Sequence, residues 1–165
     1  MTIDEIVARL GLAPHPQEGG WFVETYRSGV VLPANVLSGG TPRSLSTAIY
    51  YLVTPDSFSH LHRLPADEVF HFYLGDPVEM LLLEPAGGGR VVTLGVDLAA
   101  DMRPQVVVPA GVWQGSRLAP GGRFALLGTT VAPGFDPADY ESGDRATLAR
   151  SWPQHAERIA ALTRG

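Results

Sequence analysis

The feature that most constrains the fold is a regular series of short β-rich runs, separated by glycine and proline, between Gly20 and Val131. Many short strands with regular turn residues are typical of antiparallel sandwiches and barrels. We therefore predict an all-β fold with a short helical segment at each end. The predicted strands are Trp21–Tyr26, Ser44–Val53, Phe58–Arg63, Glu68–Tyr73, Val78–Glu84, Arg90–Val96, Pro104–Val108, Val112–Leu118 and Arg123–Val131.

The first residues predict an amphipathic helix. Apolar residues recur on one face from Ile3 to Leu10, Thr2 with Glu5 forms a capping box, and Gly11 is placed to end the helix. We expect this helix to pack on the outside of a sheet.

The C-terminal residues predict two further helices. Asp144 is an N-cap candidate for Arg145–Arg150, and Ser151 with Gln154 forms a second capping box before Ala156–Leu162. No internal repeat or linker interrupts the 165 residues, which predict one domain over 1–165.

Composition excludes several classes of function. The net charge is −5 and the twelve basic residues, all arginine, are scattered, which argues against a nucleic-acid partner. No apolar run approaches the ~20 residues of a membrane span. The acidic Asp4 and Glu5 argue against a signal peptide, and the absence of cysteine excludes disulfides and thiol catalysis. We expect a cytoplasmic protein.

Two segments suggest a subunit contact. Arg27–Arg43 is a long loop rich in glycine and proline, and such loops are often functional or lie at interfaces. The predicted strand Trp21–Tyr26 lies at a sheet edge, and exposed edges are normally covered or paired. We predict a homodimer.

The candidate site is the stretch from Ser59 to Glu68. His60 and His62 are two residues apart, so in an extended strand both imidazoles point to one side. A turn at Pro65 then lets Glu68 join them from the next strand. Two imidazoles and a carboxylate suit a divalent transition metal, acid–base chemistry, or a hydrogen-bonded patch in a ligand cavity.

Neighbouring side chains follow from the same alternation. Phe70 and Phe72 share the face of Glu68 and would form the apolar wall of a ligand pocket, whereas His71 points outside. Gln114 could be a weak oxygen ligand or could orient a substrate. His15 receives no predicted role.

Other polar and aromatic residues receive structural predictions. Arg63 and Asp67 are expected to close the turn through a surface salt bridge, and Trp113 is expected in the core. One phenol, from Tyr26, Tyr50 or Tyr51, would reach the cavity.

The spacing resembles the two motifs of the cupin superfamily. His60, His62, Glu68 and Gly75 match the first motif, with six residues between Glu68 and Gly75. Five residues separate His62 from Glu68, one more than the motif allows. In the second motif Gln114 stands where the last metal-binding histidine would be.

Three further segments are similar to the small cupin family five, of unknown function. They are 15–22, 62–73 and 130–135, which together span most of the chain. The resemblance implies a double-stranded β-helix, or jelly-roll barrel, that is usually dimeric. This barrel is similar to that of sugar-nucleotide epimerases and of plant seed storage proteins.

Three functions stay open, each with a small-molecule ligand. The first is a metal-dependent enzyme in which His60, His62, Glu68 and Gln114 hold Fe, Mn, Ni or Zn. The second is a metal-free isomerase or epimerase acting on a sugar derivative, with His62 moving a proton and Glu68 orienting it. The third is a non-catalytic ligand-binding barrel.

Overall fold

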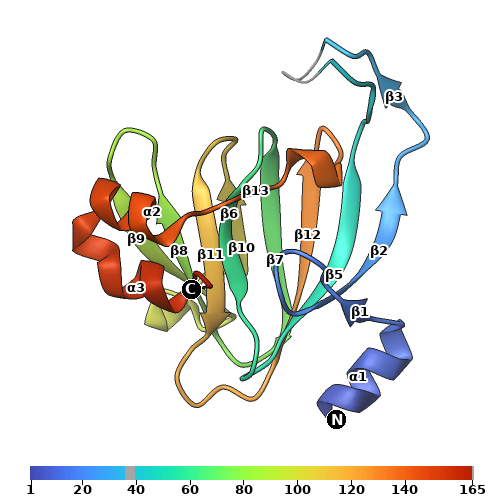
Figure 1. Cartoon of the computed structure of the whole chain (residues 1–165). Coiled ribbons are helices and arrows are strands. Elements are labelled where there is room, and N and C mark those ends of the chain that lie inside the picture. Colours follow the sequence, from blue (N-terminus) through green and yellow to red (C-terminus); the bar gives the residue numbers. More distant parts are fainter. Residues whose placement is uncertain (36–39, 165) are drawn as a thin grey trace.

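The predicted strands form two facing antiparallel sheets together with two short strands that the sequence did not predict, β1 and β13, as shown in the computed structural model of Figure 1, which describes residues 1–35 and 40–164. One sheet has the order β1-β2-β5-β12-β7-β10 and the other β13-β6-β11-β8-β9, and β3 pairs with β4. The strands are β1 (Ala13–Pro14), β2 (Trp21–Arg27), β3 (Val31–Leu32), β4 (Arg43–Ser44), β5 (Thr47–Val53), β6 (Ser59–Arg63), β7 (Asp67–Gly75), β8 (Val78–Leu83), β9 (Gly89–Leu94), β10 (Gln105–Val108), β11 (Trp113–Leu118), β12 (Ala125–Ala132) and β13 (Glu141–Ser142).

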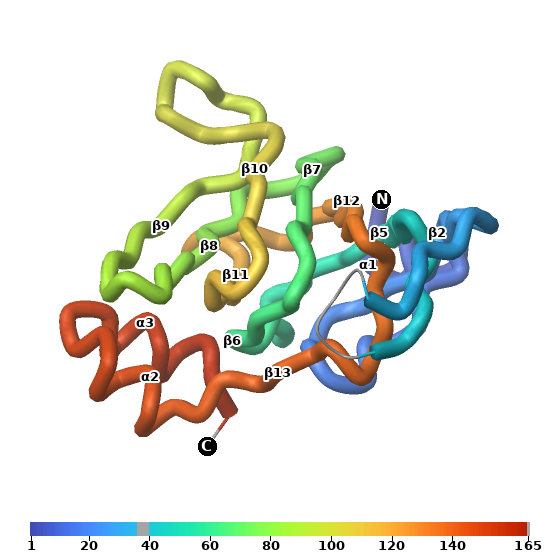
Figure 2. The backbone as a smooth tube through the Cα atoms, turned by 90° about the horizontal axis from the view of Figure 1, so that it is seen from above, coloured from blue at the N-terminus to red at the C-terminus, as the bar shows by residue number. Residues whose placement is uncertain are grey.

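The helices lie where the ends of the sequence predicted them. The α-helices are α1 (Ile3–Leu10), α2 (Arg145–Ser151) and α3 (Ala156–Ala161), and the single 3-10 turns are Leu98–Ala100, Pro137–Asp139 and Pro153–His155. Figure 2 shows α2 and α3 together beside the sheet that contains β8 and β11, with α1 on the far side of the molecule. In the described part of the chain, no helix is long and apolar enough to cross a membrane.

Most of the predicted helix caps are confirmed. Thr2 and Glu5 form the predicted capping box, Gly11 ends α1 in the left-handed conformation, and Asp144 caps α2. The capping box predicted at Ser151 is wrong, because Ser151 still belongs to α2 and a 3-10 turn precedes α3. The Trp152-Pro153 sequence explains the break, since the residue before proline is disfavoured in the α region.

The predicted strand Ser44–Val53 is divided into β4 and β5. The backbone between them instead bonds to the preceding loop, with the Ser28 amide donating to the Ser46 carbonyl at 2.9 Å. The predicted loop Arg27–Arg43 contains the short strand β3, and its residues 36–39 lie outside the described residues.

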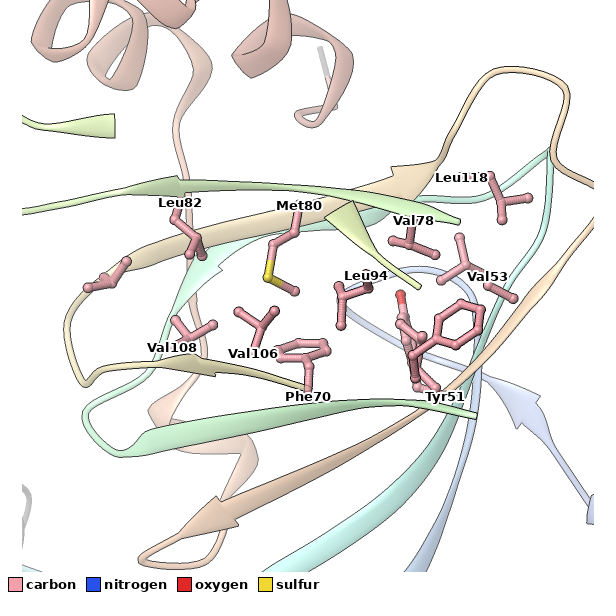
Figure 3. Packing of buried hydrophobic residues seen from close by; sticks show 14 residues of the cluster. Tyr51, Val53, Phe70, Val78, Met80, Leu82, Leu94, Val106, Val108 and Leu118 are labelled. Atoms are coloured by element: carbon pink, nitrogen blue, oxygen red, sulfur yellow. The ribbon is translucent and has the colours of Figure 1, made fainter. Parts of the chain in front are cut away.

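The core between the two sheets is strongly apolar and fills one end of the barrel. Figure 3 shows Tyr51 and Phe70 from one sheet facing Met80 and Leu82 from the other. All four are almost fully buried. Separate apolar clusters join α1, and α2 with α3, to the outer faces of the two sheets. The remaining end of the barrel contains the polar residues described next.

Candidate functional site

An irregularity in β6 decides which histidine faces the inside of the barrel. His62 pairs with Gln114 and Ser59 pairs with Ser116, so three steps along β6 match two along β11. This extra residue is a β-bulge, which breaks the alternation of side chains. Ser59 and His62 therefore both point inward, while Leu61 packs outside against the C-terminal helices.

The bulge separates the two histidines of the predicted pair. His62 lines a cavity inside the barrel, but His60 lines a separate surface depression together with Asp144 and Arg164. The prediction that both imidazoles share one face with Glu68 is therefore wrong. The extra residue between His62 and Glu68 had marked this region as irregular, but only the pairing register shows the bulge.

The predicted metal ligands do not form a metal site. His60 faces away, and Gln114 turns its amide N–H toward Glu68, donating from Nε2 to Oε2 at 2.7 Å. Among residues 1–35 and 40–164, no group of three or more histidine and acidic side chains is placed to hold a metal ion. The residues present thus do not fit the metal that the cupin resemblance implies.

The cavity that His62 lines has a volume of about 440 Å³ and lies at the polar end of the barrel. Its wall combines acidic, aromatic and aliphatic side chains from both sheets, from the loop before β2 and from the segment before β13. The lining residues are His15, Pro16, Gln17, Glu18, Phe22, Glu24, Arg27, Thr47, Ile49, His62, Leu64, Glu68, Thr129, Val131, Phe135, Pro137 and Tyr140.

His62 is held in one tautomer. Its Nδ1 lies 2.7 Å from the carbonyl oxygen of His60, which can only accept, so Nδ1 carries the proton and Nε2 has a free lone pair. The ring stacks on Tyr140, with centroids 4.8 Å apart. Burial lowers the pKa of His62, although the nearby charge of Glu68 opposes this shift. His62 is thus a neutral base at pH 7.

Glu68 is a buried carboxyl, only 7% exposed. Burial raises its pKa, and the negative charge of Glu18 raises it further, whereas the Thr129 hydroxyl and the Gln114 amide favour the ionised form. No arginine approaches it within ion-pair distance in the described part of the chain. Glu68 is therefore poised to exchange a proton.

A second acid–base group comes from the loop before β2. His15 Nδ1 accepts the backbone N–H of Glu18 at 2.9 Å, so its proton is on Nε2, which lies 3.9 Å from Glu18 Oε2. Ser59 donates to the other oxygen of Glu18. Burial raises the pKa of the Glu18 carboxyl and lowers the pKa of His15.

Sequence reasoning missed this group, because His15 and Glu18 lie outside any strand. The available signal was the pair Gly19-Gly20 directly after an acidic residue. Both glycines have positive φ, and a Cβ on Gly20 would lie 2.8 Å from the Leu52 carbonyl oxygen. The glycines thus let the loop lie flat against β5, which brings Glu18 into the cavity. The phenol of Tyr51 secures the loop by donating to the Gly19 carbonyl at 2.8 Å.

The other predicted site residues are divided between the core and the site. Phe70 and Phe72 share the inner face with Glu68, but both belong to the packed core and do not line the cavity. Gln114 donates a hydrogen bond to Glu68, but it is only 2% exposed and does not line the cavity. His71 lies on the outer face of β7, as predicted, with Nε2 at 3.3 Å from the Thr130 hydroxyl.

The predicted salt bridge across the turn is absent. Arg63 instead pairs with Glu141 of β13 at 2.7 Å and lies over the ring of Trp113, while Asp67 accepts the backbone N–H of Ala110. Trp113 is buried in the cluster below the C-terminal helices. The predicted phenol is wrong, because none of Tyr26, Tyr50 and Tyr51 lines the cavity. Tyr140 does, and the sequence analysis had not considered it.

The comparisons with known proteins agree with this architecture. A family model described as Cupin superfamily (DUF985) matches residues 4–143. The chain belongs to this family. It is 35% identical over 173 residues to the uncharacterized protein YML079W of Saccharomyces cerevisiae, covering 98% of this chain and 86% of the yeast protein.

Solved structures show the same fold over the full length. Protein SO0799 from Shewanella oneidensis has a TM-score of 0.88 at 35% identity, covering 99% of this chain and 98% of that one. A hypothetical protein from Leishmania major has a TM-score of 0.90 at 33% identity, with complete coverage of both chains. Bacillus subtilis oxalate decarboxylase, which has Mn(II) centres, reaches a TM-score of 0.53 at 14% identity over 92% of this chain and 37% of that protein. That likeness concerns the fold alone.

Proposed function

We propose that this cupin binds a small polar molecule in its cavity and moves a proton on it without a metal, as an isomerase or epimerase does. The observation that carries the proposal is the hydrogen bond from His62 Nδ1 to the His60 carbonyl. It leaves Nε2 as the proton acceptor of a buried, neutral imidazole on the cavity wall. A general base must be deprotonated and correctly oriented at the working pH, and His62 meets both requirements.

The carboxyl groups supply the complementary role. Glu18 and Glu68 line the same cavity, and burial raises the pKa of each. A carboxyl that keeps its proton closer to neutrality can donate it to a substrate oxygen. We therefore assign His62 to remove a proton from a carbon beside a carbonyl. Glu18 protonates the carbonyl oxygen, and Glu68 orients the substrate.

When both transfers run in reverse on the same face of the same carbon, the substrate is regenerated with its proton exchanged against solvent. If that carbon bears a hydroxyl group, the intermediate is an enediol; His62 then returns the proton to the former carbonyl carbon, Glu18 takes the proton of the neighbouring hydroxyl, and the product is the isomer. The epimer forms only when a second proton donor delivers its proton to the opposite face of the carbon, while His62 releases the proton it removed to solvent. No electron acceptor is required, and no net charge leaves the cavity.

Deuterium exchange tests the proposal directly. A panel of aldoses, ketoses and their amino derivatives is incubated with the protein in deuterated water, and loss of the proton beside the carbonyl is followed by NMR. We expect His62→Ala to slow exchange by about 10²–10⁴-fold, the usual contribution of a general base. His71→Ala is the matched control, because His71 lies on the outer face of the barrel.

Two results would overturn the assignment. Exchange at the wild-type rate in His62→Ala would remove His62 from the reaction. Binding of a panel member without any exchange in the wild-type protein would favour the non-catalytic ligand-binding barrel.

A further inference from the structure

The charges on the cavity wall are strongly unbalanced. Three lining residues carry carboxyl groups, Glu18, Glu24 and Glu68, of which Glu18 is protonated in the proposed reaction, and a single one, Arg27, carries a permanent positive charge. The two lining histidines are neutral near pH 7, because burial lowers the pKa of each. The wall therefore offers a ligand more negative than positive charge.

Arg27 does not correct this imbalance, because Glu24 already engages it. Its Nε donates to Glu24 Oε1 at 2.9 Å and its Nη2 to Oε2 at 2.8 Å, and Nη2 also reaches the Phe135 carbonyl at 3.3 Å. Such a two-point ion pair is the strongest form of contact between these groups. An anionic ligand would have to compete with Glu24 for this guanidinium.

The two deeper carboxyl groups have only neutral partners. Glu68 accepts from the Gln114 amide, and Glu18 accepts from the Ser59 hydroxyl and lies 3.9 Å from the neutral His15. Buried carboxylates are normally balanced by a cation or by protonation, because an isolated buried charge is costly. Glu18 is protonated in the proposed reaction, so Glu68 is the carboxylate for which a ligand can supply the positive partner.

Two further observations favour a ligand with several N–H donors. The Tyr140 hydroxyl on the cavity wall is buried without a hydrogen-bond partner among the described residues. An ammonium group has three donors and no acceptor. The aromatic rings of Phe22 and Phe135 also line the cavity, and aromatic faces attract cations.

We propose that the cavity selects a small polar molecule carrying a protonated amine, such as an amino sugar or amino alcohol, and excludes anions. This inference rests on the proposed function for its choice of site and names the substrate class of that site. The ammonium group would lie beside Glu68 and balance its charge, while Glu18 keeps the proton that it donates in the proposed reaction. A phosphate or carboxylate would instead add negative charge beside Glu68.

Matched ligands that differ only in charge provide the test. Binding of D-glucosamine, D-glucose and D-glucose 6-phosphate is measured by calorimetry at neutral pH, together with equivalent sets built on amino alcohols, alcohols and their phosphates. We expect an amine to bind about tenfold or more tightly than its neutral counterpart, and the phosphates not to bind at millimolar concentration. An equally tight neutral or anionic ligand overturns the proposal, and so does the failure of every amine to bind at millimolar concentration.

Variants locate the effect in the cavity. Glu68→Gln keeps the shape of the side chain but removes its charge, so it should reduce the preference for the amine. Glu79→Gln is the matched control, because Glu79 lies outside this cavity and pairs with Arg158. An unchanged preference in Glu68→Gln overturns the proposal.

His62→Ala separates this inference from the proposed reaction. His62 is neutral and supplies no charge, so its removal should abolish exchange but leave the preference for amines. Loss of exchange without loss of selective binding supports both proposals. Selective binding that persists although no exchange occurs in the wild-type protein refutes the reaction alone.

Discussion

The inner face of β7 has two contrasting ends. Glu68, at the start of the strand, lines the polar cavity, whereas Phe70 and Phe72 on the same face belong to the closed apolar core. Alternation places all three side chains on one side of the sheet. Their different surroundings do not arise from the neighbouring strands, since Phe70 lies opposite Val106 and Thr129 and Glu68 lies opposite two valines. They arise from the facing sheet, from which Gln114 donates to Glu68, whereas Met80 belongs to the apolar cluster of Phe70. Position along a strand, as well as its face, therefore decides whether a residue contacts a ligand or the core.

This contrast also separates two kinds of energetic contribution. The closed end stabilises the fold by burying apolar surface at close to crystal-like packing. The open end buries two carboxyl groups whose raised pKa values show that the folded state disfavours their ionised forms. We infer that the cavity is maintained at a cost in stability that increases with pH.

The largest expected effect is at the closed end. Phe70→Ala removes a ring that is 2% exposed and should lower the free energy of unfolding by about 3–5 kcal/mol, measured by denaturant titration. Val107→Ala, on the exposed face of β10, is the control and should change little. If Phe70→Ala were as stable as the wild-type protein, the division into a packed end and an open end would be wrong. Phe70→Leu serves if the alanine variant does not fold.

At the open end we expect a smaller effect of the opposite sign. Because the pKa of Glu68 is raised above 4.5 on folding, the folded state binds more protons than the unfolded state above this pH, and stability falls as pH rises toward the raised value. Glu68→Gln removes this loss. Between acid and alkaline pH, the free energy of unfolding of the variant should therefore rise by on the order of 1 kcal/mol relative to that of the wild-type protein.

Melting temperatures across this range measure the gain, with Glu79→Gln as the control of equal charge change outside the cavity. A stability difference between Glu68→Gln and wild type that does not vary with pH would contradict the raised pKa.

The smallest effect should come from the boundary between the two ends. Thr129 lies opposite Phe70 in the ladder, and its hydroxyl favours the ionised form of Glu68. Thr129→Val keeps the shape and should change stability by less than about 1 kcal/mol at low pH. It should raise the pKa of Glu68 further, so that stability falls more steeply with pH than in the wild-type protein. If the pH dependence of stability in Thr129→Val equals that of the wild-type protein, the Thr129 hydroxyl does not influence the ionisation of Glu68.

Local patterns predicted much of the fold. The strands from Trp21 to Val131 follow the glycine and proline spacing, and Thr2 and Asp144 cap their helices as expected. These features depend on residues close together in the chain, so propensity and short-range hydrogen bonds are sufficient to specify them. The errors at Ser151 and within Ser44–Val53 arose where a proline or a loop contact changed a local preference.

The site was harder to predict, because its residues come from separated segments. Glu68 and His62 were identified correctly as inward-facing, but the role of His60 depended on the register between β6 and β11. Glu18 and Tyr140 enter the cavity from irregular segments, to which no periodicity applies. Their importance becomes visible only when the loops are folded against the sheets.

The sequence by itself determined the class of fold, the positions of most of its longer strands and of the turns between them, and the cupin family. These follow from side-chain periodicity and turn chemistry, which act over a few residues. The tertiary structure alone decided that a bulge turns His60 away from His62, and that Glu18 joins Glu68 beside one cavity. Both outcomes depend on pairing and packing between segments that are distant in the sequence. Patterns among neighbouring residues do not show which distant segments come together.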